Sequence, residues 1–384
     1  MLTKDEVQYI RERIAPHVAP VLSLYADVNP AKPENARRAW VTRAKNALRE
    51  LEMPEAVRQR VASALEEQVI PEARTLVLFA SHELFQRYNL HCELPVVDLA
   101  HGRVEARWGE PYVTPLLYAI DEYERAGVLW LAGEGWRFFE VFLGEIQEAD
   151  QVFAAVDPED WQRLREYEPS RGSTLARLHP YPDRDKYSRR MEAWAHRFLR
   201  RLAHLLERAV AEREIHRLVL LGREETTRRF ESYLSRAMRN RVVAHSNDVP
   251  LSNATPRDIL ETVGPVLEAA EREQELQLLD RVRSQPGVWG LRGTLSALQE
   301  GRLSVLVAPW KLESRVWRCP EGWLAASREE ALAVCPDAEP VEVPLRDHLA
   351  ELAAEFAARL EFVRGEAETR LIAELGGLAG LVRW

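Results

Sequence analysis

Segments typical of buried strands alternate with amphipathic segments along the whole chain. Apolar runs bounded by turn-forming residues predict strands at residues 21–28, 75–80, 89–97, 217–221 and 303–308. Segments with helical periodicity lie between them, and the clearest places apolar residues at steps of three and four: Met191, Trp194, Phe198, Leu202 and Leu205. Because alternating strands and helices are the signature of α/β proteins, the sequence predicts an α/β fold of the mixed α+β kind.

The length of 384 residues corresponds to two or three domains of ordinary size. Thr114-Pro115 ends a passage rich in turn residues, and Thr255 followed by Pro256 is typical of a helix start. We therefore place domain boundaries at these two points. The predicted domains are an amino-terminal α/β domain at 1–115, a middle domain at 116–255 and a carboxy-terminal domain at 256–384.

The net charge of −9 argues against a nucleic-acid partner for the chain as a whole, because phosphate binding depends on Lys and Arg. Residues 161–241, however, contain 19 Arg and one Lys against 11 acidic residues, a net charge of +9. This asymmetry indicates a polyanionic partner for one part of the chain. A solvated helix face, with Arg favoured by coding bias, is the alternative that the charge leaves open.

Basic residues crowd the segment 157–190, which has few apolar residues, several Pro and no clear period. Those from residue 171 onwards are Arg171, Arg177, Arg184, Lys186, Arg189 and Arg190. His179, Tyr181 and Tyr187 interleave with them. Arginine beside aromatic residues on a mobile loop suits the phosphates and unstacked bases of RNA. We therefore expect this irregular segment to contact nucleic acid.

The sequence predicts a soluble cytoplasmic protein. The first residues form an amphipathic helix with a capping box of Thr3 and Glu6, so we expect no signal peptide. The longest apolar stretches fall far short of the ~20 residues that a membrane span needs. Cys92, Cys319 and Cys335 are too few and too scattered for a disulfide framework, which indicates a reducing compartment.

Motifs for metal, cofactor or nucleophilic chemistry are lacking in the sequence. Cys319 and Cys335 have neither a CxxC spacing nor a close His, so we expect buried or unpaired thiols and not zinc ligands. The ten His residues show no HxxxH or HExxH spacing, and the glycines fit no phosphate-binding loop. Ser173 has no positioned base nearby. We therefore expect no catalytic residue, no metal and no cofactor.

Three stretches carry a family resemblance in the same order along the chain. The first is VLSLYADVNP at 21–30, followed by a basic helix with Arg37, Arg38, Arg43 and Lys45. The second is DEYERAGVLWLAGEGWRFFEVFLGEI at 121–146. The most specific is the closing block, with GLRGTLSALQEGRLSVLVAP at 290–309, LRDHLAELAAEFAARLEFV at 345–363 and GGLAGLVRW at 376–384. Together they resemble the bacterial branch of the archaeal and eukaryotic release factor 1/Pelota superfamily.

The resemblance implies a three-domain factor that enters the ribosomal A site, with an RNase H-like middle domain and an L7Ae-like α/β sandwich as its carboxy-terminal domain. In such proteins the first domain approaches the decoding centre and the middle domain points towards the peptidyl-transferase centre. The last domain contacts a translational GTPase, which is elongation factor Tu for the family's hibernation factor Balon. The resemblance also implies a monomer. Its implied partners are the 70S ribosome, with its 23S and 16S rRNA, and elongation factor Tu or a related GTPase.

The resemblance also bears on catalysis, because the middle-domain loop of release factors carries Gly-Gly-Gln, which positions water against the peptidyl-tRNA ester. The corresponding residues 169–174 (PSRGST) contain one Gly and no Gln. A non-catalytic factor that contacts rRNA is therefore implied. The implied contacts in the large subunit are Arg171, Gly172, Ser173, Arg177, Arg184, Lys186, Arg189 and Arg190. Those near the decoding centre are Asn29, Arg37 and Arg38.

The sequence thus predicts a non-catalytic, stress-related ribosome-binding factor that acts in hibernation or rescue. Two alternatives stay open. An enzyme would hydrolyse peptidyl-tRNA, or would cleave RNA through carboxylates such as Asp121, Glu140 and Glu145, since the superfamily's middle domain resembles the RNase H fold. A stress-related adaptor would bind proteins and no RNA.

Overall fold

The structure is a computed structural model that describes residues 2–67, 73–131, 135–172, 182–247 and 254–383. The chain forms two compact units, which we call the middle unit (Glu124–Ala270) and the split unit (Leu2–Tyr123 together with Glu271–Trp384). The first two predicted domains contribute one sheet each and the last contributes two, but the first and the last share the split unit. The boundaries at 115/116 and 255/256 therefore stay a prediction.

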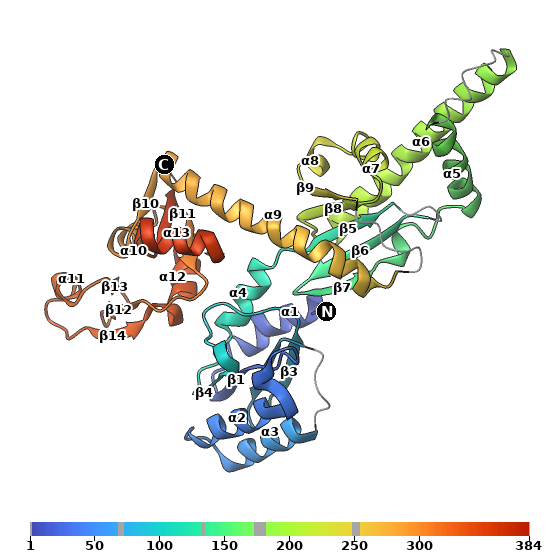
Figure 1. Ribbon diagram of the computed structural model, residues 1–384. Coiled ribbons are helices and arrows are strands. Elements are labelled where there is room, and N and C mark those ends of the chain that lie inside the picture. The colour runs from blue at the N-terminus through green and yellow to red at the C-terminus, as the bar shows by residue number, and fades with distance from the viewer. Residues whose placement is uncertain (1, 68–72, 132–134, 173–181, 248–253, 384) are drawn as a thin grey trace. The chain divides into compact units, whose positions relative to one another are not determined.

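The amino-terminal lobe of the split unit, residues 2–123, is built on an antiparallel sheet of order β3-β2-β1-β4 (Figure 1). Its strands are β1 (Val21–Asp27), β2 (Thr75–Ala80), β3 (Phe85–Leu90) and β4 (Val104–Gly109). Its helices are α1 (Lys4–Tyr9), α2 (Ala39–Arg49), α3 (Glu55–Glu67) and α4 (Thr114–Glu122), with helical turns at Ile10–Ile14, Pro33–Arg38 and Ala100–Gly102. The predicted strand at 89–97 is wrong, because a tight turn directly after β2 starts β3 earlier.

Strand β1 holds this lobe together because it is buried on both faces. Leu22 and Leu24 point to one face, where they share a core cluster with Trp40 of α2 and Val61 of α3. On the other face, Tyr25 packs edge-on against Phe79 of β2 at a ring distance of 6.2 Å. The continuous apolar sequence of β1 thus reflects burial from two sides.

The carboxy-terminal lobe, residues 271–384, is the α/β sandwich that the resemblance implied. Its sheet has the order β10-β16-β11-β15, and β15 is parallel to β11 whereas β16 is antiparallel. The strands are β10 (Gly287–Trp289), β11 (Leu303–Pro309), β15 (Arg359–Val363) and β16 (Ala379–Val382). Helices α10 (Leu291–Gln299) and α12 (Leu349–Glu355) pack in one core cluster. The end of α9 (Pro256–Ser284) and α13 (Gly365–Leu375) form a second cluster.

Strand β10 passes so close to the end of α9 that only glycine fits at its first position. A Cβ atom on Gly287 would lie 2.2 Å from the carbonyl oxygen of Val282. Because backbone atoms cannot swing aside, Gly287→Ala should lower the free energy of unfolding by about 1–3 kcal/mol, as measured in urea. Gly293→Ala is the control, since a Cβ there meets no atom within 4 Å. Equal stability of the two variants would contradict the close approach.

A small subdomain lies between β11 and β15. Its sheet has the order β13-β12-β14, made of β12 (Arg315–Arg318), β13 (Leu324–Ala325) and β14 (Val341–Pro344), beside α11 (Arg328–Val334) and a turn at Leu345–Asp347. Cys319 follows β12, Cys335 follows α11, and the two form a disulfide. The expectation of unpaired thiols is therefore wrong, because the hairpin and the helix bring together ends that are 16 positions apart.

Thiol counting checks this disulfide. Cys92 is buried and free. Protein purified and denatured without reductant should therefore react with one equivalent of iodoacetamide, whereas reduced protein should react at all three cysteines. Mass spectrometry measures the difference. Labelling of a Cys92→Ser variant before reduction would contradict the pairing.

The middle unit contains a sheet of order β7-β6-β5-β8-β9 in the described part of the chain. Its strands are β5 (Ala126–Trp130), β6 (Arg137–Phe142), β7 (Glu145–Glu148), β8 (Arg217–Leu221) and β9 (Val242–Ser246). Strand β8 is parallel to both β5 and β9, whereas β6 is antiparallel to β5 and β7. This order agrees with the RNase H-like sheet that the resemblance implied. The predicted mixed α/β fold is confirmed.

Helices cover both faces of this sheet. They are α5 (Pro158–Gly172), α6 (Pro182–Glu212), α7 (Glu224–Glu231) and α8 (Arg236–Arg239), with a helical turn at Asp150–Val152. Leu202 of α6 and Phe230 of α7 join the core on one face, whereas Ile259 and Val263 of α9 cover the other. The prediction that 157–190 is irregular is wrong for its described residues, most of which lie in α5 and α6. Their low apolar content reflects the exposure of most of their described side chains to solvent.

Candidate nucleic-acid interface

Helix α6 separates an apolar face from a basic face. It is 31 residues long, or about 46 Å, and its apolar face is buried in the middle unit through Ala195, Phe198, Leu199, Leu202 and Leu206. We call its other side the basic face; it exposes Arg197, Arg200, Arg201, His204 and Arg208. Among the described residues no helix, α6 included, is both long and apolar enough to cross a membrane. The core fixes one side of α6, and the other side displays cations.

The cations of the basic face are only partly neutralised. Arg201 Nη2 donates to the carbonyl oxygen of Ala155 at 3.1 Å, and its Nη1 lies 3.9 Å from the Asp160 carboxylate. Arg208 Nε lies 3.3 Å from the Glu212 carboxylate. Arg197 and Arg200 have no acidic partner within the described ranges. An exposed guanidinium without a partner keeps its capacity for bidentate hydrogen bonds to phosphate.

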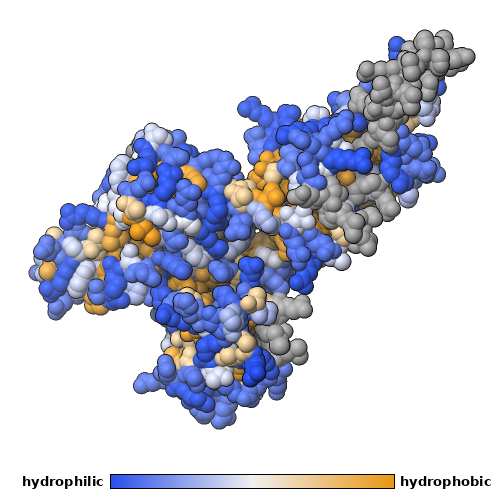
Figure 2. Space-filling model, viewed as in Figure 1, coloured by the Kyte–Doolittle hydropathy of each residue, from blue (hydrophilic) through white to orange (hydrophobic). Residues whose placement is uncertain are grey.

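The side chains of this face border an open hollow of about 670 Å³, lined by Arg197, Arg200, Arg201, His204, Leu205, Glu207 and Arg208. The acid in this lining, Glu207, accepts a hydrogen bond from the backbone N–H of Ser235 at 2.9 Å. The cations therefore outnumber the acid around the hollow, and Figure 2 shows a mostly hydrophilic surface over this region. Charge of this kind attracts a phosphate backbone.

Four of the predicted rRNA-binding residues lie where α5 ends or beyond it. Arg171 and Gly172 are the last two residues of α5, and their side chains are outside the described part. Ser173 and Arg177 lie outside the described residues altogether. Their contact with RNA stays a prediction.

The other four predicted residues of the middle domain belong to α6. Arg184 and Lys186 lie in its first turns, where side chains are not described. Arg189 and Arg190 follow and are exposed. All four thus precede the basic face on the same helix, and their role as RNA contacts stays a prediction.

The predicted residues near β1 differ in what their side chains do. The Asn29 side-chain oxygen accepts a hydrogen bond from the backbone N–H two residues later at 3.0 Å. Arg38 Nη2 donates to the carbonyl oxygens of Leu65 at 2.8 Å and Glu66 at 2.9 Å, near the end of α3. Arg38 therefore stabilises a helix end, whereas Arg37 is exposed. Their role as RNA contacts stays a prediction.

The sequence interpretation missed the basic face itself. Its signal was present, because the basic residues at 197–208 recur at steps of three and four between the members of the apolar stripe. A charge count over 161–241 does not reveal this order. Only the helical phase shows that these cations share one side.

The carboxylates of the nuclease alternative engage other groups in the described residues. Glu140 forms an ion pair with Arg125 and lies 3.9 Å from Arg213 Nε. Glu145 is half-buried in β7, and the side chain of Asp121 lies outside the described part. Paired in this way, Glu140 is neutralised by protein cations.

One group of side chains in the described ranges could meet at a metal ion. Cys319, Glu321 and Cys335 place their ligand atoms within 4.8 Å of one another. Both sulfurs are joined in the disulfide, however, and metals bind thiolates. The expectation that the chain binds no metal stays a prediction.

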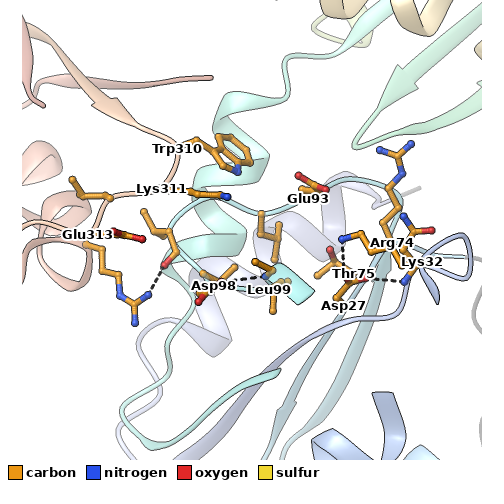
Figure 3. A pocket seen from close by; sticks show the side chains of 17 residues that line it. Asp27, Lys32, Arg74, Thr75, Glu93, Asp98, Leu99, Trp310, Lys311 and Glu313 are labelled. Atoms are coloured by element: carbon orange, nitrogen blue, oxygen red, sulfur yellow. Dashed lines mark hydrogen bonds and ion pairs between the residues drawn. The ribbon is translucent and has the colours of Figure 1, made fainter. Parts of the chain in front are cut away.

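A cavity of about 270 Å³ lies inside the split unit. Figure 3 shows Trp310 and Lys311 on one side and Lys32 and Arg74 on the other. Its lining includes four cationic and four acidic side chains, and Lys32 pairs with the buried Asp27 at 2.6 Å. This balance gives the cavity no preference for an anion.

Three known structures are similar to the chain at low sequence identity. The archaeal termination factor aRF1 is 15% identical, with 100% of this chain and 98% of that chain covered and a TM-score of 0.26. Archaeal Pelota in a model of ribosome-bound Pelota and ABCE1 is 12% identical (100% and 94% covered, TM-score 0.40). S. cerevisiae Dom34, described as a translation termination-like factor, is 8% identical (75% and 75% covered, TM-score 0.36).

A family model matches the central part of the chain. Residues 111–270 match the family described as bacterial archaeo-eukaryotic release factor family 10. No curated protein sequence matches the chain. The family match ends where the middle unit ends and includes its sheet and α6. The segment that carries the basic face is therefore similar to the bacterial archaeo-eukaryotic release factors, which confirms the resemblance predicted from the sequence.

Proposed function

We propose that this protein is a non-catalytic factor that binds the ribosome in rescue or hibernation, together with elongation factor Tu or a related translational GTPase. The observation that carries the proposal is the basic face of α6, because it lies in the segment that matches a release-factor family. The resemblance of the outer segments to the same superfamily supports it.

The physical case for RNA rests on how α6 is held. Its apolar face is fixed in the core, so the exposed Arg197, Arg200 and Arg201 are displayed on a rigid element. Arginine forks match phosphate oxygens and stack on unpaired bases. Arg189 and Arg190 extend the charge along the helix towards the predicted loop contacts. We therefore propose ribosomal RNA as the polyanion.

Occupancy without catalysis is proposed because of the sequence at 169–174. That segment has one Gly and no Gln, whereas the resemblance implies that peptide release needs Gly-Gly-Gln. The basic residues of 171–190 would still hold RNA. Such a factor would occupy the A site without positioning water against the peptidyl-tRNA ester.

Sedimentation of purified 70S ribosomes with the protein tests the proposal. We expect binding at low salt and a linear fall of log K with log salt, because each neutralised phosphate releases counterions. With about five phosphate contacts, raising the salt from 50 to 200 mM should weaken binding roughly 100- to 1,000-fold. No co-sedimentation at low salt, with or without elongation factor Tu, would refute it.

Two further assays distinguish the alternatives. Turnover of peptidyl-tRNA or RNA that is lost when Arg171, Gly172 and Ser173 are substituted would indicate an enzyme. An adaptor would show two results. The chain would not bind ribosomes, and its complex with another protein would persist when the six basic residues of 171–190 are replaced by Glu.

A further inference from the structure

The chain passes between the split unit and the middle unit twice, after Tyr123 and before Glu271. Tyr123 follows α4, and Glu271 lies within α9. Arg364, at the residue before α13, makes contacts beside both passages. These contacts all lie inside the split unit.

The side chain of Arg364 holds the first passage. Its Nη2 donates a hydrogen bond to the Tyr123 hydroxyl at 2.8 Å. Its guanidinium carbon lies 3.0 Å from the ring centroid of Trp310 and 5.6 Å from that of Tyr123. The Tyr123 hydroxyl in turn donates to the carbonyl oxygen of Glu93 at 3.3 Å. A planar, permanently charged group suits this stacked position, which a Lys side chain does not reproduce.

The backbone of the same residue holds the second passage. The N–H of Arg364 donates to Glu275 Oε2 at 3.2 Å, and Glu275 is only 7% exposed. Its other oxygen lies 3.1 Å from Arg272 Nη1, an ion-pair distance. Burial raises the pKa of Glu275 to about 7, and Arg272 opposes that rise. A carboxylate buried at such a cost indicates that its contacts hold α9 in place.

We propose that Arg364 is a clamp that fastens both chain passages to one point of the split unit, so that they loosen together and not separately. Tyr123 accepts its side-chain hydrogen bond and Glu275 accepts its backbone hydrogen bond, and we call these two residues the arms of the clamp. The coupling is direct, because one residue supplies both the side-chain bond and the backbone bond. The clamp is a conformational device inside the split unit, and it is separate from RNA binding.

Hydrogen exchange of the full-length protein, followed by mass spectrometry, tests the clamp. Arg364→Met should speed exchange about ten-fold in peptides from both passages, 114–123 and 271–276, because each loses a hydrogen bond or its support. Peptides from β11 and β16 should exchange as before. Arg370→Met is the matched control, since Arg370 lies on α13, the helix that Arg364 precedes, and bonds α9 through Asp280 at 2.8 Å, away from Tyr123. Faster exchange in only one passage, or an equal effect of Arg370→Met, would overturn the proposal.

Variants of the two arms keep the test decisive if Arg364→Met unfolds the lobe. Glu275→Ala removes the acceptor at the second passage and should also loosen 114–123, whereas Glu275→Gln keeps an acceptor and should restore protection. Tyr123→Phe should loosen 271–276 in the same way. Asp280→Ala is the control on α9. An effect of each arm variant confined to its own passage would show two independent contacts and no clamp.

Discussion

Replacing Arg197, Arg200 and Arg201 together by Gln is expected to weaken ribosome binding about 100-fold at 0.15 M salt. Each substitution removes one exposed positive charge from the basic face of α6, and three lost phosphate contacts no longer release counterions. The slope of log K against log salt should fall by about 2 to 3 units. Gln is a good helix former, so α6 itself should persist.

A matched variant separates this effect from a general loss of charge. Arg257, Arg283 and Arg328 lie in other helices and form ion pairs with Glu261, Glu374 and Glu339. Their joint replacement by Gln removes the same charge and should leave the slope within about one unit. Sedimentation over a salt series measures both variants. Equal losses would assign binding to net charge and not to the basic face.

Trp136→Ala should cause the largest loss of stability, about 3–5 kcal/mol. Trp136 is 6% exposed, and its ring lies 4.5 Å from Phe230, 5.7 Å from Trp161 and 6.4 Å from Phe153. These rings join the residue before β6 to α5 and α7 in the core that carries α6. Truncation leaves a large cavity, because rings on three sides cannot collapse into it.

Calorimetry should show the transition of the middle unit at a melting temperature lower by about 10 °C. Trp289→Ala in the split unit is the control. Trp289 is 51% exposed, so its loss should shift the melting temperature of the split unit by no more than about 2 °C. Because α6 rests on the damaged core, Trp136→Ala should also weaken ribosome binding near the melting point. A shift below that of the control would contradict this packing.

The sequence predicted strands that are wholly or mostly buried. The apolar runs at 21–28, 75–80, 217–221 and 303–308 are strands within one residue of the predicted ends. Pro256 is the first residue of α9, and Thr255 caps it by accepting from the backbone N–H of Asp258 at 3.3 Å. Such features depend on local pattern, so they are legible without the fold.

Features that depend on distant residues were not predictable in this way. Arg38 became a helix-capping residue only because α3 ends beside it. The disulfide needs the turn that joins β12 to β13 and the position of α11. Helix α5 has so few apolar residues that its periodicity is weak, since only Trp161 and Leu164 are buried among its described side chains. The basic face could be recognised in the sequence, but only once the residues of α6 were placed around a helix.

The split unit is expected to fold after the middle unit. Arg107 and Asp347 form an ion pair at 3.0 Å although 240 positions separate them, and β16 inserts between β10 and β11, which precede it in the chain by most of the lobe. Closing such long loops is entropically slow, whereas the middle unit joins segments that are nearer in sequence. Refolding should therefore be biphasic, with the middle unit first. Until the later phase is complete, the amino-terminal lobe lacks its contacts with the carboxy-terminal lobe, which lies later in the chain.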